Sequence, residues 1–100
     1  MIAETEKFAI NKVRGVYAEG YPTASGFLVL KGSVISDHIT DSFEIACRWY
    51  YAFRQQLIAD GVIRDRVFTV DYEFKSPTAA ASVIIGRMAS GNQHWNKTEM

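Results

Sequence analysis

The sequence predicts an α+β domain: a small antiparallel or mixed sheet in β-β-α-β-α order, with two helices packed on one face. Three observations support this prediction. Residues 67–75 alternate apolar and polar side chains, as a strand with one buried face does. Residues 41–61 repeat apolar side chains at helical spacing. Residues 76–86 begin with serine and proline and end in glycine, which is typical of a short capped helix.

Length and composition indicate one globular domain. The chain has 100 residues, enough for a single hydrophobic core. Hydrophobic residues make up 48% and aromatic residues 13%, so we expect much of that core to consist of rings. No internal repeat, low-complexity tract or linker divides the sequence, and we therefore interpret residues 1–100 as one domain.

The formal net charge is zero, from 11 basic and 11 acidic residues. This balance argues against a dominant polybasic surface, and so against tight non-specific binding to a phosphate backbone, although it allows a local basic patch. Cys47 is the only cysteine, which excludes an internal disulfide and indicates a reducing compartment. Residues 1–7 do not resemble a signal peptide, and no apolar run approaches the roughly 20 residues of a membrane span. We therefore expect a cytoplasmic protein without membrane contact.

The first two elements are predicted to be strands that form a hairpin. Residues 8–18 are rich in apolar side chains, with a bulge expected at 12–15, where the alternation fails. Turn-forming glycine and proline residues fill 19–25. Residues 27–35 form the second strand, which we expect to bend at Gly32.

A long helix is predicted to follow. Asp41 and Glu44 match a capping box at its start, and Asp60-Gly61 supplies the glycine that commonly ends a helix. The side chains expected to form its inward apolar stripe are those of Ala46, Trp49, Tyr50, Phe53, Leu57 and Ile58. The polar residues expected mostly off that stripe are Arg48, Arg54, Gln55 and Gln56.

A strand and a short helix close the predicted fold. The side chains of the strand 67–75 expected to face the core are Phe68, Val70, Tyr72 and Phe74. Ser76 is then the N-cap of the helix and Pro77 its first residue. This helix start could also hold a phosphate, but capping is the simpler interpretation because it needs no ligand. Small side chains at 79–82 give the helix a thin face, and residues 86–91 end it.

The segment from Tyr72 to Ala81, followed by Gly86-Arg87 and Gly91, resembles a bacterial domain of unknown function. That family has phenylalanine-x-serine-proline-serine followed by three alanines, then glycine-arginine and alanine-asparagine-glycine. Residues 26–33 and 57–63 agree with the family as well, so the similarity covers residues 26–97. The family is often fused to GIY-YIG nucleases and is similar to a domain associated with restriction enzymes and adenine methylases. The resemblance therefore implies a nucleic-acid context.

Two departures from the family pattern fall in the loop after the short helix. Ser90 stands in place of the family's asparagine, and Asn92 in place of the tryptophan that directly follows the glycine. Trp95 answers to a second aromatic position. If this loop binds a ligand in the family, the resemblance implies weaker contacts in this chain.

Catalytic and metal-binding residues are not indicated. His38 and His94 are the only histidines, and both fall in polar connectors without a positioned partner. Cys47 is expected to be an inert thiol within the long helix. The acidic residues between 60 and 73 are expected to be solvated rather than convergent. We therefore expect a non-catalytic domain with no cofactor and no metal.

The basic residues nearest the family-like segment give a candidate nucleic-acid site. Its residues are Lys75, Arg87, Ser90, Gly91, Trp95 and Lys97. The lysines and the arginine would contact phosphates, and Trp95 would stack on a base. The alternative is that Trp95 packs on the alanine face of the short helix and the charged side chains are solvated. The expected partner is nucleic acid or a nuclease or restriction protein.

An interaction domain is the alternative function. The zero net charge is combined with an unusual number of rings around one helix, namely Trp49, Tyr50, Tyr51 and Phe53. Tyr50 and Tyr51 cannot both face one core, so one of them is expected at the surface or at an interface. This alternative predicts a protein-docking unit or a homo-oligomer such as a homodimer.

Overall fold

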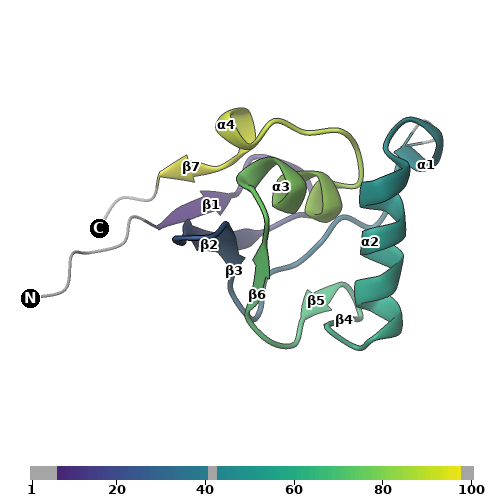
Figure 1. Cartoon of the computed structure of the whole chain (residues 1–100), viewed down its shortest axis with the longest axis horizontal. Helices are drawn as coiled ribbons and strands as arrows, with labels where there is room; N and C mark the ends of the chain where they lie inside the picture. The colour runs from purple at the N-terminus through teal and green to yellow at the C-terminus, as the bar shows by residue number, and fades with distance from the viewer. Residues whose placement is uncertain (1–6, 41–42, 98–100) are drawn as a thin grey trace, which may run out of the picture.

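The computed structural model describes residues 7–40 and 43–97 and confirms the α+β class (Figure 1). Five strands form one antiparallel sheet in the order β6-β3-β2-β1-β7, and a separate ribbon pairs β4 with β5. The elements are β1 (Phe8–Ile10), β2 (Ala18–Pro22), β3 (Phe27–Val29), α1 (Phe43–Ala46), α2 (Arg48–Ala59), β4 (Ile63–Arg64), β5 (Val67–Phe68), β6 (Tyr72–Phe74), α3 (Pro77–Ile85), α4 (Gly91–His94) and β7 (Asn96–Lys97).

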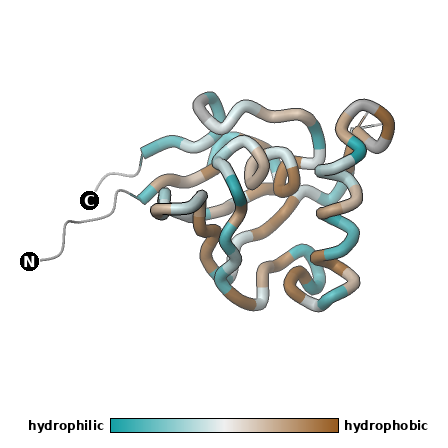
Figure 2. The backbone as a smooth tube through the Cα atoms, in the orientation of Figure 1, coloured by the Kyte–Doolittle hydropathy of each residue, from teal (hydrophilic) through white to brown (hydrophobic). Residues whose placement is uncertain are grey.

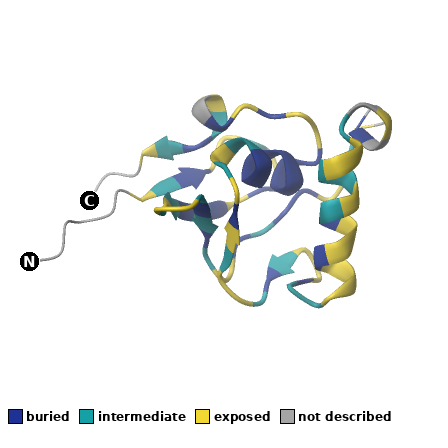
Figure 3. Ribbon diagram, in the orientation of Figure 1, coloured by how far each residue is buried: buried dark blue, intermediate teal, exposed yellow. Residues whose placement is uncertain are grey.

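Helix α3 forms the centre of the core. It contacts β3, β6 and α2, and every residue from Ala79 to Ile85 is buried (Figure 3). The small alanine side chains allow this close approach of several elements. Both predicted caps are confirmed, because the Ala79 amide donates to Ser76 Oγ at 3.1 Å and Gly86 ends the helix with a φ of 86°.

The first hairpin turns earlier than the sequence predicts. Residues 11–15 make the turn, and β2 occupies much of the stretch expected to be the loop. A Cβ at Gly20 would lie 2.4 Å from the Leu28 carbonyl oxygen, so glycine is needed there for close pairing with β3. Pro22 ends β2 beyond its pairing with β1, where its missing N–H costs nothing. The predicted turn is therefore wrong for residues 19–22.

The other two predicted strands, 27–35 and 67–75, are each interrupted. β3 stops at Val29, and Gly32 has a φ of 92° in the turn that follows, before Val34 pairs again with Tyr17 and Val67. The predicted strand 67–75 is divided into β5 and β6. Val70 lies between them and is 49% exposed, so its expected inward orientation is wrong.

A second hairpin causes that interruption. β4 pairs with β5, and the turn between them places Asp65 and Arg66 at φ values of 54° and 68°. The Thr69 amide then donates to the Val62 carbonyl at 2.8 Å, which ties the end of β5 back to the start of β4. The sequence did not predict this hairpin because its strands have two residues each and its turn lacks the glycine that usually supplies positive φ.

The predicted long helix is broken into α1 and α2 at Cys47, whose φ of −124° and ψ of 50° are not helical. The predicted end at Asp60-Gly61 is confirmed, with Gly61 at a φ of 81°. The expected capping box depends on Asp41, which lies outside the described residues. Apolar residues also lie on α1, at the outside of the molecule (Figure 2), where Ile45 is exposed.

The inward face of α2 differs from the predicted stripe. Tyr50 and Phe53 are half-buried against the core and Leu57 is buried, as expected. Trp49 and Ile58 are exposed, so their inclusion in the stripe is wrong. Arg54 is 5% exposed although it was expected mostly off the stripe.

Arg54 is buried because it binds backbone oxygens from two other segments. Its Nη1 donates to the Val83 carbonyl at 2.8 Å and to Ser36 Oγ at 3.2 Å, and its Nη2 donates to the Ser36 carbonyl at 2.8 Å. Burial lowers the pKa of the guanidinium, which nevertheless remains charged near neutral pH. The cation also opposes the negative end of the α3 dipole. One side chain therefore joins α2, the last turn of α3 and the segment after β3.

The two ends of the described chain lie side by side. β7 pairs with β1, with Phe8 opposite Lys97. Figure 1 places both ends at the side of the molecule away from α2. At the other edge of the five-stranded sheet lies β6.

Replacing Arg54 by alanine is expected to lower the free energy of unfolding by about 3 kcal/mol, because two buried carbonyl groups lose charged donors. Urea titration followed by circular dichroism measures this change. The matched control is Arg48→Ala on the exposed side of the same helix, with an expected change within about 0.5 kcal/mol. Equal stability of the two variants would contradict the structural role of Arg54.

Candidate functional site

The six residues predicted to contact nucleic acid do not form one site. Lys75 directly follows β6 and Lys97 ends β7, and these strands are opposite edges of the sheet. Arg87 and Ser90 are exposed in the loop between α3 and α4. The remaining two, Gly91 and Trp95, are buried. The described structure therefore places Lys75, Arg87 and Lys97 in three different segments, whereas the aromatic ring that was expected to accompany them is buried.

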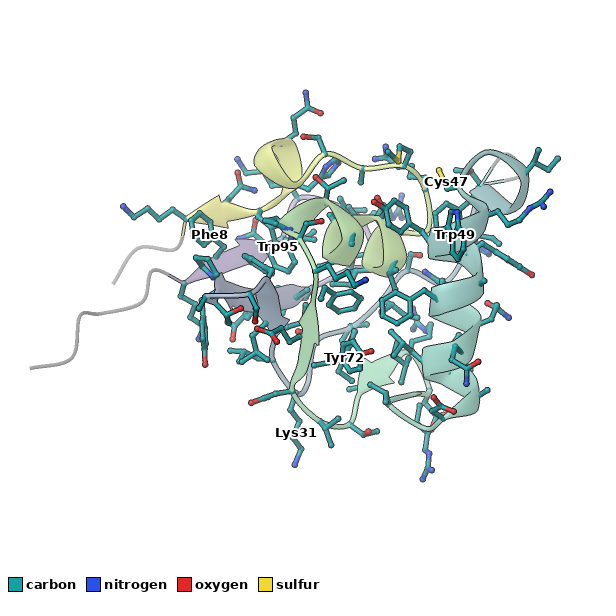
Figure 4. The ribbon with its side chains drawn as sticks, in the orientation of Figure 1. Phe8, Lys31, Cys47, Trp49, Tyr72 and Trp95 are labelled. Carbon is teal, nitrogen blue, oxygen red and sulfur yellow. The ribbon has the colours of Figure 1, made fainter. Side chains whose placement is uncertain are left out.

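Trp95 is part of the core, with 5% of its surface exposed. Its ring centroid lies 4.5 Å from that of Phe27, and its Nε1 donates to the Pro77 carbonyl at 3.0 Å (Figure 4). A ring held in this way offers no open face to a base. Of the two interpretations of Trp95, packing is the one that the structure shows, against β3 and the start of α3.

Gly91 is explained by a close approach of two helices. Its amide donates to Thr78 Oγ1 at 3.1 Å, at the start of α3. A Cβ at this position would lie 2.7 Å from Pro77 Cβ and 2.8 Å from the Thr78 amide nitrogen. The neighbouring Ser90 begins α4 without a capping bond from its side chain. This part of the family-like segment therefore fastens α4 to α3.

The histidines and the cysteine do not converge. His38 is exposed, and its Nε2 lies 3.9 Å from Oδ2 of Asp37, which is also exposed. His94 Nδ1 lies 2.9 Å from the Ser90 carbonyl oxygen. Cys47 is half-buried at the break between α1 and α2. Across residues 7–40 and 43–97, no three His, Cys, Asp or Glu side chains are grouped as a metal site would require.

The acidic residues expected to be solvated also hold local structure. Asp71 Oδ1 accepts the Lys31 amide at 2.7 Å, and Asp60 accepts a hydrogen bond from Gln56 at 2.9 Å. The Glu73 carboxylate accepts the hydroxyls of Thr23 and Ser25 from the hairpin between β2 and β3. These two hydrogen bonds lower the pKa of Glu73, so that it is ionised at neutral pH.

A groove of about 510 Å³ lies between α2 and β6, and the sequence did not identify it as a site. Its aromatic lining consists of Trp49, Tyr50, Phe53, Tyr72 and Phe74, and Lys75 lies at its rim. We call it the aromatic groove. A second hollow, of about 210 Å³ beside Trp95, is lined by apolar and ring side chains and Gly91.

Packed rings form the base of the aromatic groove. The Phe53 centroid lies 5.8 Å from that of Tyr72 and 5.5 Å from that of Phe74, in edge-on geometry that aromatic pairs favour. Trp49 differs from them because 87% of its surface is exposed. Figure 4 shows Trp49 on α2 and Tyr72 on β6. The groove thus combines a fixed aromatic base with one large ring left in water.

One sequence signal did point toward this region. The run from Trp49 to Phe53 holds more rings than one inward helix face can bury. In the structure Tyr50 lines the aromatic groove, and the Tyr51 ring packs on Phe43, with centroids 6.3 Å apart. The second wall of the groove comes from β6, whose rings were expected to serve only the core.

No helix in the described parts of the chain is both long and apolar enough to cross a bilayer.

Comparison with known proteins identifies one family. A family model described as a domain of unknown function (DUF4357) matches residues 8–100. No curated protein and no solved structure matches the chain.

Replacing Gly91 by alanine is expected to lower the free energy of unfolding by about 1–3 kcal/mol, because the new Cβ would overlap backbone atoms at the start of α3. Thermal unfolding measures the change. Ser90→Ala is the matched control, since the Ser90 side chain is exposed and caps nothing, and a change within about 0.5 kcal/mol is expected. An unchanged stability of the Gly91 variant would contradict the packing role of this glycine.

Proposed function

Because the chain belongs to the DUF4357 family of domains of unknown function, we propose a function from its own surface: a non-catalytic domain that binds a polypeptide in the aromatic groove. The observation that carries this proposal is the Trp49 side chain, which is 87% exposed beside a hollow of about 510 Å³. Exposed rings next to a concave apolar surface are typical of protein interaction sites, where Trp and Tyr contribute much of the binding energy.

The lining of the groove supports binding and not catalysis. Among the residues that line it only Glu73 and Lys75 are charged, and the Glu73 carboxylate already accepts hydrogen bonds from two hydroxyl groups. Proton transfer or nucleophilic attack requires a positioned pair of polar groups within hydrogen-bond reach. The rings instead offer a large apolar contact area at a small entropic cost.

Polypeptide is a better ligand for this groove than nucleic acid. A nucleic-acid strand is held by several cations along its backbone together with open ring faces. Lys75 is the one basic residue in the groove lining, and the other predicted phosphate contacts, Arg87 and Lys97, are not part of it. Trp95, the predicted stacking ring, is buried. We therefore propose the interaction function that the sequence left as an alternative.

The resemblance also bears on the source of the polypeptide. It implies that relatives of this domain work beside nucleases and restriction enzymes, so a segment of such a protein is the partner that we propose. A second copy of this chain is the competing partner, and it would make the domain a homodimer. Light scattering over a range of concentrations distinguishes the two, since a homodimer forms without added ligand.

The test uses a display library of random linear ten-residue peptides, selected on the folded protein. Selected peptides are expected to bind Trp49→Ala at least tenfold more weakly, because truncation of a central aromatic residue removes a binding hot spot. The stability of this variant should stay within about 0.5 kcal/mol of the parent, because the ring is exposed. Met88→Ala removes an apolar side chain that is 60% exposed outside the groove lining and should leave the affinity unchanged.

Three results would count against the proposal. The first is that the library yields no binder, and the second is that the selected peptides bind Trp49→Ala as tightly as the parent protein. The third is that single-stranded oligonucleotides bind while peptides do not. Trp49 fluorescence reports on the last case, with the buried Trp95 as an internal reference.

A further inference from the structure

We propose that the polypeptide binds as an additional β-strand along the outer edge of β6, with alternate side chains in the aromatic groove and an acidic residue beside Lys75. This inference rests on the proposed function and specifies the ligand: an extended segment in which apolar and polar residues alternate. Four observations support it, namely the orientation of the β6 backbone, the openness of its edge, the direction of its side chains and the charge at the rim.

The hydrogen bonds at the tip of the β2–β3 hairpin determine the orientation of the β6 backbone. Thr23 and Gly26 exchange both backbone hydrogen bonds, at 2.8 and 3.4 Å. Bonded and non-bonded pairs alternate along an antiparallel ladder, so Leu28 directs its N–H and C=O toward β2. The neighbours of Leu28 therefore bond to β6, and its own partner there, Glu73, does not bond to β3. The Glu73 amide and carbonyl thus point to the outer edge.

The outer edge of β6 is open. β6 is the last strand of the five-stranded sheet, and the ribbon of β4 and β5 forms a separate sheet. Within residues 7–40 and 43–97, no other segment bonds to the Glu73 or Lys75 backbone. Unpaired edges of this kind invite pairing with another chain, and domains that bind peptides by strand addition use them.

The aromatic groove lies along this edge. Its lining includes Glu73 and Lys75 of the β6 segment as well as Trp49, Ala52 and Gln56 on one face of α2. A strand hydrogen-bonded to β6 would lie about 4.8 Å from it, between β6 and the helix. The molecule therefore has an unpaired backbone edge and a facing helical wall in the same place.

Side-chain alternation determines what such a strand would contact. Phe74 faces the core side of the sheet, whereas Glu73 faces the opposite side, where it binds the hydroxyls of the β2–β3 hairpin. Side chains of an added strand alternate in the same way. One set would enter the aromatic groove against Phe53 and Trp49, and the other set would lie beside Glu73 and Lys75.

The positive charge of Lys75 at the rim of the groove favours an acidic residue among the peptide side chains that would lie beside Glu73 and Lys75. Glu73 is ionised and already accepts two hydrogen bonds. Lys75 is exposed, and in the described structure no carboxylate lies within ion-pair distance of it. A cross-strand pair of opposite charge contributes favourably to strand pairing. The unmatched cation therefore selects a ligand with a carboxylate opposite Lys75.

A single strand fits this place better than a second copy. Pairing of two β6 edges about a two-fold axis would carry each copy's α2 toward the groove of the other, because α2 forms the wall beside that edge. An extended peptide carries no helix that would be brought toward the groove. A homodimer is nevertheless one of the outcomes that the experiment distinguishes.

The experiment uses the tightest peptide from the display selection, resynthesised with a single N-methyl group at each position in turn. If the peptide adds a strand, N-methylation should weaken binding at least tenfold at every second residue and change it less than threefold at the residues between. The bound peptide should also slow hydrogen exchange of the Glu73 amide, measured by NMR. Lys75→Glu should weaken binding of the acidic peptide at least fivefold, whereas Lys12→Glu, the same charge change in the first turn, should not.

The outcomes separate this inference from the proposed function. Binding that depends on Trp49 but shows no two-residue period and no protection of Glu73 overturns strand addition and leaves the groove as the binding site. Binding that does not depend on Trp49, or a failure to select any peptide, overturns both. If the protein forms dimers without peptide, and dimerisation slows hydrogen exchange of the Glu73 amide, a second copy and not a peptide occupies the β6 edge.

Discussion

The arrangement of the helices depends on the hydrogen bonds of the buried Arg54 guanidinium. Its hydrogen bonds reach the Val83 carbonyl near the end of α3 and both oxygens of Ser36. In the described structure its partners are carbonyl and hydroxyl oxygens rather than a carboxylate. Such a cation is tolerated in the interior because several oxygens and the α3 dipole replace its water. Since α2 carries this side chain, the same contact sets where the outer wall of the aromatic groove stands.

The sequence predicted correctly the helix ends that depend on neighbouring residues of the chain. The Ser76 cap, the Gly86 end of α3 and the position of Gly61 follow from side chains within a few residues, and the structure confirms them. Elements that depend on distant partners were predicted less well. Gly20 indicated a turn until the close approach of β3 explained it, and Arg54 resembled a surface residue until its oxygen partners were placed.

The candidate site shows the same division. The sequence indicated Gly91 and Trp95 because they match positions of the family-like segment, and both belong to the packing of α4 and β7 on the core. The aromatic groove consists instead of residues from α2 and from β6, which are separated in the chain and each resemble ordinary core residues. No pattern within either segment indicates that they leave a hollow between them. The exposure of Trp49 beside this hollow becomes visible only once the helix is oriented.

The pairing of β1 with β7 has a consequence for how this domain can be attached to other molecules. The two described ends emerge next to each other, at the sheet edge opposite β6. A fluorophore, a surface linker or a fused protein joined at either end would therefore stand away from α2. The domain can thus be tethered at one edge of its sheet while α2 and the opposite edge, β6, stay accessible from solution.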